Sequence, residues 1–129
     1  MASVPIFRLG STLIATVQED MNDGDALSLQ ANLAKLLEIG HTNGVLLDIS
    51  VLGMVDSFLG RLINDIASMA RLMGSHTVVV GMQPAVAITL VELGLELRGV
   101  RTALTAEKGL ALLQRLTAAE VRLRHYGAR

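Results

Sequence analysis

Two nearly continuous apolar runs constrain the fold of this 129-residue chain more than any other feature. Residues 44–49 read Gly-Val-Leu-Leu-Asp-Ile, and residues 77–81 read Thr-Val-Val-Val-Gly. Runs of this length and composition are typical of strands in a parallel sheet that is covered on both faces. Amphipathic helical patterns separate the two runs, and this alternation predicts an α/β fold.

Turn formers and capping residues divide the first half of the chain into further elements. Residues 6–9 and 13–17 are short apolar runs on either side of Gly10-Ser11, which is a signal for a type II′ hairpin between antiparallel strands. A helix that Asp23 or Asp25 can cap follows, and Gly40 ends it. The apolar face of this helix recurs at helical spacing and comprises Ala26, Leu29, Leu33, Leu36 and Leu37.

A second helix is predicted from Asp56-Ser57 to Gly74, because an apolar stripe with a polar opposite side begins there. The stripe comprises Phe58, Leu59, Leu62, Ile63, Ile66, Met69, Ala70 and Met73. The methionines at positions 54, 69, 73 and 82 are interpreted most simply as core filler, although methionine also suits adaptable interfaces.

Two more helices and a weak strand complete the pattern. A third helix starts at Pro84, which the first helical turn tolerates, and runs through Ala85, Ile88 and Val91 to Gly94. A strand near residues 100–104 precedes a last helix from about residue 106 toward residue 124. The predicted order is ββαβαβαβα, in a mixed and mostly parallel sheet with right-handed crossovers. The order of the strands within the sheet stays open.

The length predicts a single domain over residues 1–129, with a core of about 4–116 and a helical extension or tail at 117–129. Apolar residues make up 51% of the chain and its mean hydropathy is +0.50, which favours a persistent protein–protein surface besides the core. Without cysteines the chain has no disulfides or thiolate metal sites, and this fits a cytoplasmic protein.

Several classes of partner have little support in the sequence. The stretch 72–91 has no Asp, Glu, Lys or Arg, but turn formers at 74–77 and 81–84 interrupt it, so no membrane span is expected. The amino terminus does not resemble a signal peptide. No basic, aromatic-rich stripe supports nucleic-acid binding.

Charge is distributed unevenly along the chain. Residues 1–64 carry a balance of −4 and residues 65–129 a balance of +3. Four carboxylates crowd the connection between the second strand and the first helix: Glu19, Asp20, Asp23 and Asp25. The basic cluster of the tail, interpreted as a solvated helix face, comprises Arg115, Arg122, Arg124 and Arg129.

The pair Asp56-Ser57 is the sharpest candidate for a functional site, because a strand and a short loop deliver it to a helix start. One interpretation is that both side chains cap the helix by accepting from its free N–H groups. The other is that Ser57 is phosphorylated, since a helix amino terminus stabilises an added phosphate. From spacing alone, capping is favoured. Arg61 lies one turn further on, where it can partly offset the added charge.

Other chemistries lack a complete set of residues. A phosphoacceptor receiver domain would use Asp48 and the Glu19-Asp20 pair, but no lysine falls near the last strand, and the opening hairpin breaks the regular alternation. The histidines at 41, 76 and 125 are isolated, and no metal site is expected. No phosphate-binding glycine loop or nucleophile elbow is present. We therefore expect neither catalysis nor a cofactor.

Several segments together resemble the STAS family. They are residues 54–59 (Met-Val-Asp-Ser-Phe-Leu), 69–74 (Met-Ala-Arg-Leu-Met-Gly), 81–87 (Gly-Met-Gln-Pro-Ala-Val-Ala) and 90–94 (Leu-Val-Glu-Leu-Gly). The Asp-Ser pair at the helix start is shared with anti-sigma-factor antagonists. The segment 81–87 and Thr102-Ala103-Leu104 are more specific to stressosome antagonists of the RsbS type. The similarity extends from about residue 6 to residue 116.

The resemblance implies a single STAS domain that acts in a stress-signalling assembly and is not an enzyme. Such members form a cage with a sensor-bearing paralogue (RsbR type) and hold a serine/threonine kinase of the anti-sigma type (RsbT type). Phosphorylation of the serine that matches Ser57 releases this kinase, and a PP2C-like phosphatase reverses the mark. The chain begins close to its first predicted strand, which favours the antagonist over the sensor paralogue. The alternative is an anti-sigma-factor antagonist regulated by the same serine.

With the resemblance included, the phosphorylation hypothesis is favoured for Ser57. Partner contacts are expected around it, at Asp56, Phe58, Arg61, Gln83 and Pro84. The tail beyond residue 116 lies outside the resemblance, and no function is assigned to it.

Overall fold

The computed structural model describes residues 4–127, except for the side chains of residues 121 and 123–127. Five strands form one sheet in the order β1-β2-β3-β4-β5, so each strand pairs with its neighbours in the sequence. Strand β1 (Ile6–Leu9) is antiparallel to β2 (Thr12–Thr16). Strands β3 (Gly44–Asp48), β4 (His76–Val80) and β5 (Val100–Ala103) continue the sheet in parallel with β2. The predicted element order and the mostly parallel sheet are confirmed.

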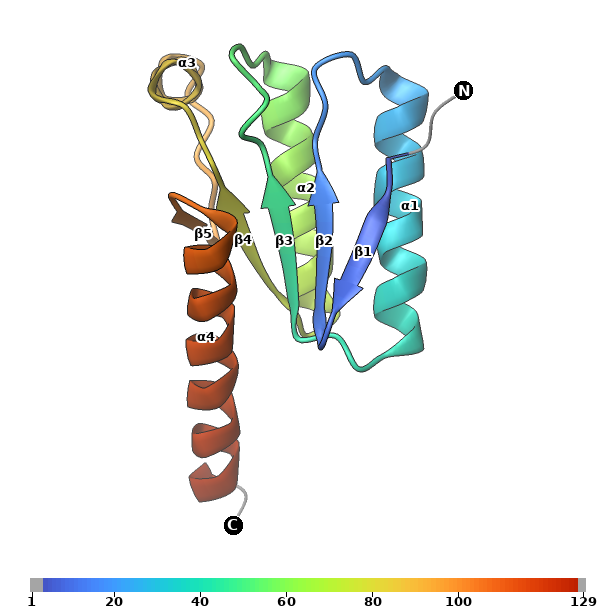
Figure 1. Ribbon diagram of the computed structural model, residues 1–129, viewed down its shortest axis with the longest axis vertical. Coiled ribbons are helices and arrows are strands. Elements are labelled where there is room, and N and C mark those ends of the chain that lie inside the picture. The colour runs from blue at the N-terminus through green and yellow to red at the C-terminus, as the bar shows by residue number, and fades with distance from the viewer. Residues whose placement is uncertain (1–3, 128–129) are drawn as a thin grey trace.

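The helices cover the two faces of the sheet unequally (Figure 1). Helices α1 (Asp23–Ile39), α2 (Ser57–Leu72) and α3 (Pro84–Glu92) contribute to the larger hydrophobic core on one face. Each of these helices connects one strand to the next parallel strand, always in the same direction across the sheet. Because such connections are right-handed, all three helices lie on the same face. Helix α4 (Ala106–Gly127) packs on the opposite face, against β3, β4 and β5.

The hairpin between β1 and β2 turns at Gly10-Ser11 as predicted. Gly10 has a φ of +60°, whereas Ser11 is not among the residues with positive φ. A type II′ turn requires this combination, because only its first central residue is left-handed.

The N-cap of the first helix lies one residue before Asp23 and three before Asp25, the two predicted caps. Asn22 is its N-cap, and the side chain of Asn22 accepts from the Asp25 backbone N–H at 2.8 Å. The Asp25 carboxylate accepts from the Asn22 backbone N–H at 3.2 Å, which completes a capping box. The prediction of Asp23 or Asp25 as the cap was therefore wrong in detail, although Asp25 takes part. Gly40 follows the helix with a φ of +93°, as predicted.

The third helix turns only part of its apolar surface to the core. Val86 and Leu90 are buried, whereas Ile88 and Val91 are 60% and 79% exposed. The helix is apolar almost all around and has no single apolar stripe, so the sequence does not indicate which face is buried.

The fourth helix packs closely on the sheet through a glycine. A Cβ atom at Gly109 would lie 2.5 Å from Val80 Cγ1 and 3.0 Å from Leu46 Cδ1. The second core cluster gathers here and comprises Leu46, Val78, Val80 and Leu113. The helix is continuous to Gly127 and extends below the lower ends of the strands in Figure 1. Among the described residues, no helix is both long and apolar enough to cross a membrane.

Candidate functional site

The start of α2 is built by the loop that follows β3. Asp56 is the N-cap of α2, with an extended backbone (φ −113°, ψ 179°). Its Oδ1 accepts from the Leu59 backbone N–H at 2.9 Å, which satisfies one of the free donors of the first turn. Buried Leu52 and Val55 anchor the preceding loop to the core.

Ser57 is the first residue of α2, and its side chain is half-buried. The hydrogen bond of this side chain is with Arg61, whose Nη2 donates to Ser57 Oγ at 3.4 Å. The contact is long and lies at the exposed surface, so it holds the hydroxyl only weakly. The interpretation that both residues of the pair cap the helix is therefore corrected: Asp56 makes the cap, and the hydroxyl of Ser57 faces Arg61.

The loop before Ser57 exposes two large apolar side chains. Val51 is 49% exposed and Met54 is 82% exposed. The interpretation of Met54 as core filler was wrong, and Met73, at 41% exposed, also lies at the surface. Met69 and Met82 do pack against the core. Sequence reasoning missed Val51 and Met54 as surface residues, because an apolar residue in a loop carries no sign of which way it faces.

Gln83 connects the start of α3 to this loop. Its Nε2 donates to the Ser50 carbonyl oxygen at 2.9 Å, and the loop itself is braced by Asp48 Oδ1, which accepts from the Ser50 N–H at 2.9 Å. Pro84 is the first residue of α3 and is exposed. Gln83 and Pro84 therefore lie at the same end of the sheet as Ser57, beyond the carboxyl ends of β3 and β4, but in the neighbouring loop.

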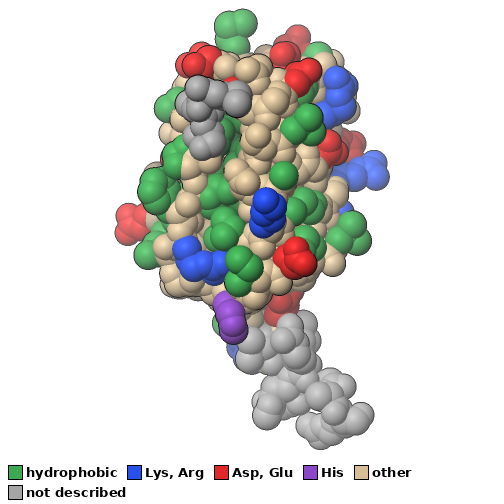
Figure 2. Space-filling model, turned by 90° about the vertical axis from the view of Figure 1, so that its right-hand side faces the viewer, with side chains coloured by type: hydrophobic (Ala, Val, Ile, Leu, Met, Phe, Trp, Pro, Cys, Tyr) green, Lys and Arg blue, Asp and Glu red, His purple; other side chains and the backbone are tan. Residues whose placement is uncertain are grey.

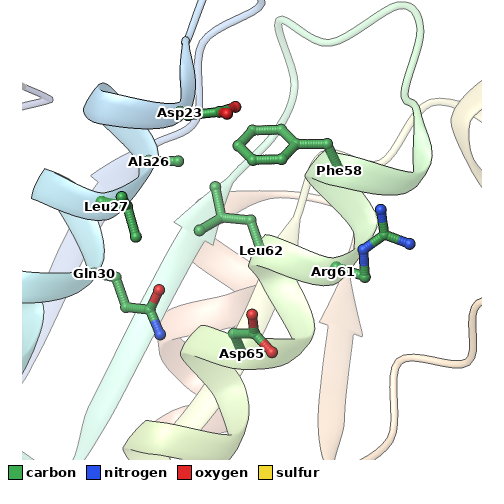
Figure 3. A pocket seen from close by; sticks show the side chains of 8 residues that line it. All are labelled: Asp23, Ala26, Leu27, Gln30, Phe58, Arg61, Leu62 and Asp65. Carbon is green, nitrogen blue, oxygen red and sulfur yellow. The ribbon is translucent and has the colours of Figure 1, made fainter.

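A groove runs between α1 and α2 beside Ser57 (Figure 3). It has a volume of about 280 Å³ and is lined by Asp23, Ala26, Leu27, Gln30, Phe58, Arg61, Leu62 and Asp65. In Figure 3 the carboxylate of Asp23 points toward the ring of Phe58, and Arg61 points away from α1. Asp23 of the acidic connection and Phe58, the residue that follows Ser57, therefore line one groove.

The acidic connection between β2 and α1 makes this end of the molecule negative. Glu19, Asp20 and Asp23 are all exposed. Figure 2, which views the side that carries β1 and α1, shows acidic side chains gathered at the upper end. This is the end at which the loops after β2, β3 and β4 meet.

The histidines lie apart from this site. His41 follows α1 with a φ of +64°, and His76 is the first residue of β4. The side chain of His125 lies outside the described residues. Within the described part of the chain, no three His, Asp or Glu side chains are grouped closely enough to hold a metal ion.

A family model for the STAS domain matches residues 5–108. The chain belongs to the STAS family. In this STAS domain the Asp56-Ser57 pair, which is one part of the resemblance, lies at the start of α2.

Two solved structures share more than a third of their residues with this STAS domain. A serine-to-glutamate variant of RsbS from Moorella thermoacetica is 36% identical, with a TM-score of 0.80, and the match covers 91% of this chain and 99% of that one. A chain from the molecular architecture of the stressosome, described as a signal integration and transduction hub, is 37% identical, with a TM-score of 0.77 and coverage of 88% and 98%.

A more distant likeness bears on the fold alone. The anti-sigma factor antagonist SpoIIAA in its unphosphorylated form is 13% identical, with a TM-score of 0.68 and coverage of 87% of this chain and 96% of that one. No curated protein matches the chain.

Proposed function

We propose that this STAS domain is a non-catalytic antagonist and scaffold of a stressosome. In this role it sequesters a serine/threonine kinase of the anti-sigma type (RsbT type) and releases that kinase when Ser57 is phosphorylated. The observation that carries the proposal is the hydroxyl of Ser57 at the start of α2, which makes only a long surface contact with Arg61, in a chain more than a third identical to RsbS and to a stressosome component.

The division of roles within the Asp-Ser pair supports a switch at Ser57. Because Asp56 makes the cap, the Ser57 hydroxyl can be modified without removing a hydrogen bond that holds the helix. A phosphate there gains from the free N–H groups and the positive dipole end of α2. The fold is therefore expected to survive the modification.

The electrostatic change is large on the scale of this surface. The charges of Asp56 and Arg61 cancel in the unmodified chain, and a phosphate on Ser57 changes their local sum to about −2. The acidic connection at Glu19, Asp20 and Asp23 lies at the same end of the molecule, so the added charge increases a field that is already negative. A kinase surface that tolerates the unmodified end would then be repelled.

The docking surface for the kinase would surround Ser57. Asp56, Arg61, Gln83 and Pro84 are exposed, and Phe58 is half-buried. Val51 and Met54 add the apolar contact area that a stable interface needs in its centre. Gln83 has a second task, since its hydrogen bond to Ser50 holds the loop that carries these apolar side chains.

The remaining partners and the location belong to the same proposal. The domain would assemble with itself and with a STAS-containing sensor paralogue (RsbR type) in the cytoplasm, and a PP2C-like phosphatase would restore Ser57. An anti-sigma-factor antagonist would use the same serine but would remain small. Light scattering of the mixture with the paralogue distinguishes the two, because only the scaffold gives a very large particle.

The test of the switch is site mapping by mass spectrometry after incubation with the kinase and ATP. We expect one phosphate, on Ser57, and none on the Ser57→Ala variant. Ser68→Ala is the matched control, because Ser68 is an exposed serine of the same helix, and this variant should be labelled like the unaltered chain. Label on another residue, or label that persists in Ser57→Ala, would refute the proposed site.

A further inference from the structure

The last turns of α4 extend past the sheet. The Nε2 of His76 lies 2.7 Å from Glu120 Oε1, although the two atoms are not aligned as a hydrogen bond. This contact puts Glu120 beside the first residue of β4, at the amino end of that strand. The helix continues for seven residues to Gly127, which at about 1.5 Å per residue is roughly 10 Å of helix beyond the strand.

The sequence of this extension is basic and amphipathic. Residues 121–129 contain neither Asp nor Glu, and they include Arg122, which is exposed, and Arg124. Leu123 continues a row of positions at helical spacing that begins with Leu116 and Ala119. On a helix the residues before and after a given position lie about 100° to either side of it, so two arginines flank the position of Leu123.

The groove between α1 and α2 offers the complementary chemistry. Its apolar lining comes from Ala26, Leu27, Leu62 and Phe58, and its carboxylates are Asp23 and Asp65. Asp23 and Asp65 lie toward opposite ends of the space drawn in Figure 3, and the guanidinium of Arg61 turns away from α1, toward Ser57. The sequence Arg122-Leu123-Arg124, an apolar residue between two basic ones, therefore complements an apolar lining with two carboxylates.

The groove and the extension are at opposite ends of the molecule. The groove lies between the amino-terminal parts of α1 and α2, which follow the carboxyl ends of β2 and β3. The extension leaves the sheet at the amino end of β4 (Figure 1). A chain therefore cannot fill its own groove, and the occupant has to come from another molecule.

We propose that the end of α4 of one molecule docks in the α1–α2 groove of a second copy of this chain, with Arg122 and Arg124 beside Asp23 and Asp65. Such a contact is heterologous, because each copy contributes a different surface, and it leaves one free groove and one free helix end at every stage. Self-association is then open-ended unless the rotation between copies closes a ring. The proposal does not depend on Ser57 or on a kinase.

Sedimentation of the full chain over a range of concentrations measures this association. We expect the mean mass to rise with concentration at about 0.1 M salt and to fall toward that of the monomer at about 1 M salt, because the Debye length shortens from about 10 Å to about 3 Å. A chain that stays monomeric at every concentration in low salt would overturn the proposal.

Two charge-reversal variants make the test specific. In the groove variant, Asp23→Lys and Asp65→Lys, both the groove and the helix end are basic. In the tail variant, Arg122→Glu and Arg124→Glu, both are acidic. Each variant alone should self-associate at least about tenfold more weakly than the unaltered chain. The equimolar mixture should regain association, because each groove then meets a helix end of opposite charge.

Matched controls use exposed charges elsewhere on the same helices. Lys108→Glu changes the first turn of α4 and Glu38→Lys changes the far end of α1, and both should associate like the unaltered chain. A mixture of the two reversal variants that remains monomeric, while circular dichroism shows both to be folded, would contradict the proposed contact. Reversal variants that associate as tightly as the unaltered chain would contradict it too. Neither result would bear on phosphorylation of Ser57.

Discussion

Replacing Asp56 with alanine removes the side-chain cap of α2, whereas replacing Ser57 leaves that cap in place. The loss of an N-cap hydrogen bond such as the one from Leu59 N–H costs about 1 kcal/mol. Removing a negative charge from the positive end of the helix costs a further 0.3–1 kcal/mol or so. We therefore expect Asp56→Ala to lower the free energy of unfolding by about 1–2 kcal/mol, or the melting temperature by roughly 3–8 °C.

Ser57→Ala should change stability by less than about 0.5 kcal/mol. It loses only the long surface contact with Arg61, and alanine is the better helix former at that position. Urea unfolding followed by circular dichroism compares the two variants, and an unchanged dependence on urea shows that they unfold to a similar state. The reasoning is refuted if Ser57→Ala destabilises the domain as much as Asp56→Ala does.

Two further predictions concern helices α3 and α4. Leu90→Ala should lower the free energy of unfolding by about 2–4 kcal/mol, because Leu90 is buried. Val91→Ala should lower it by less than about 1 kcal/mol, because Val91 is 79% exposed. Equal losses in urea unfolding would contradict the observed face of α3. Gly109→Val should lower the free energy of unfolding by at least about 2 kcal/mol, because its Cβ would meet Val80 and Leu46. The control Ala118→Val, at an exposed position of the same helix, should cost under about 1 kcal/mol. A Gly109→Val variant as stable as Ala118→Val would show that α4 does not pack closely at that residue.

Much of the architecture could be predicted because the local signals are strong. Gly10-Ser11 between two apolar runs specifies a hairpin turn that few other pairs make. The runs that became β3 and β4 are short and rich in Val and Leu, which is typical of central strands in a parallel sheet. Glycines at 40, 74 and 94 follow the helices with a positive φ, which their lack of a Cβ atom permits.

The helix caps, the buried face of α3 and the exposure of Met54 could not be predicted from the sequence. They depend on contacts between distant residues, or on a choice between neighbouring residues of equivalent chemistry. Asp56 and Ser57 can both cap a helix, and the cap falls to Asp56 because its backbone is extended where the loop joins α2. Asn22 likewise competed with Asp23 and Asp25. The face of α3 could not be predicted from a segment without an apolar stripe, and the exposure of Met54 depends on how the loop passes over the core.

The candidate site was therefore only partly predictable. Its serine and the neighbours at Asp56, Phe58 and Arg61 follow from a single stretch of sequence. The groove that joins Asp23 to Phe58 and the brace from Gln83 to Ser50 arise from residues 33–35 positions apart, which only the sheet order brings together.

The most direct test of the claim that Ser57 controls kinase release is the affinity of the anti-sigma-type kinase for the chain. Calorimetry measures this affinity before and after stoichiometric phosphorylation. A phosphate on Ser57 should weaken kinase binding at least about tenfold, which corresponds to about 1.4 kcal/mol, while circular dichroism shows the same fold. Binding that is unchanged or tighter with the phosphate in place would contradict the claim that Ser57 controls kinase release.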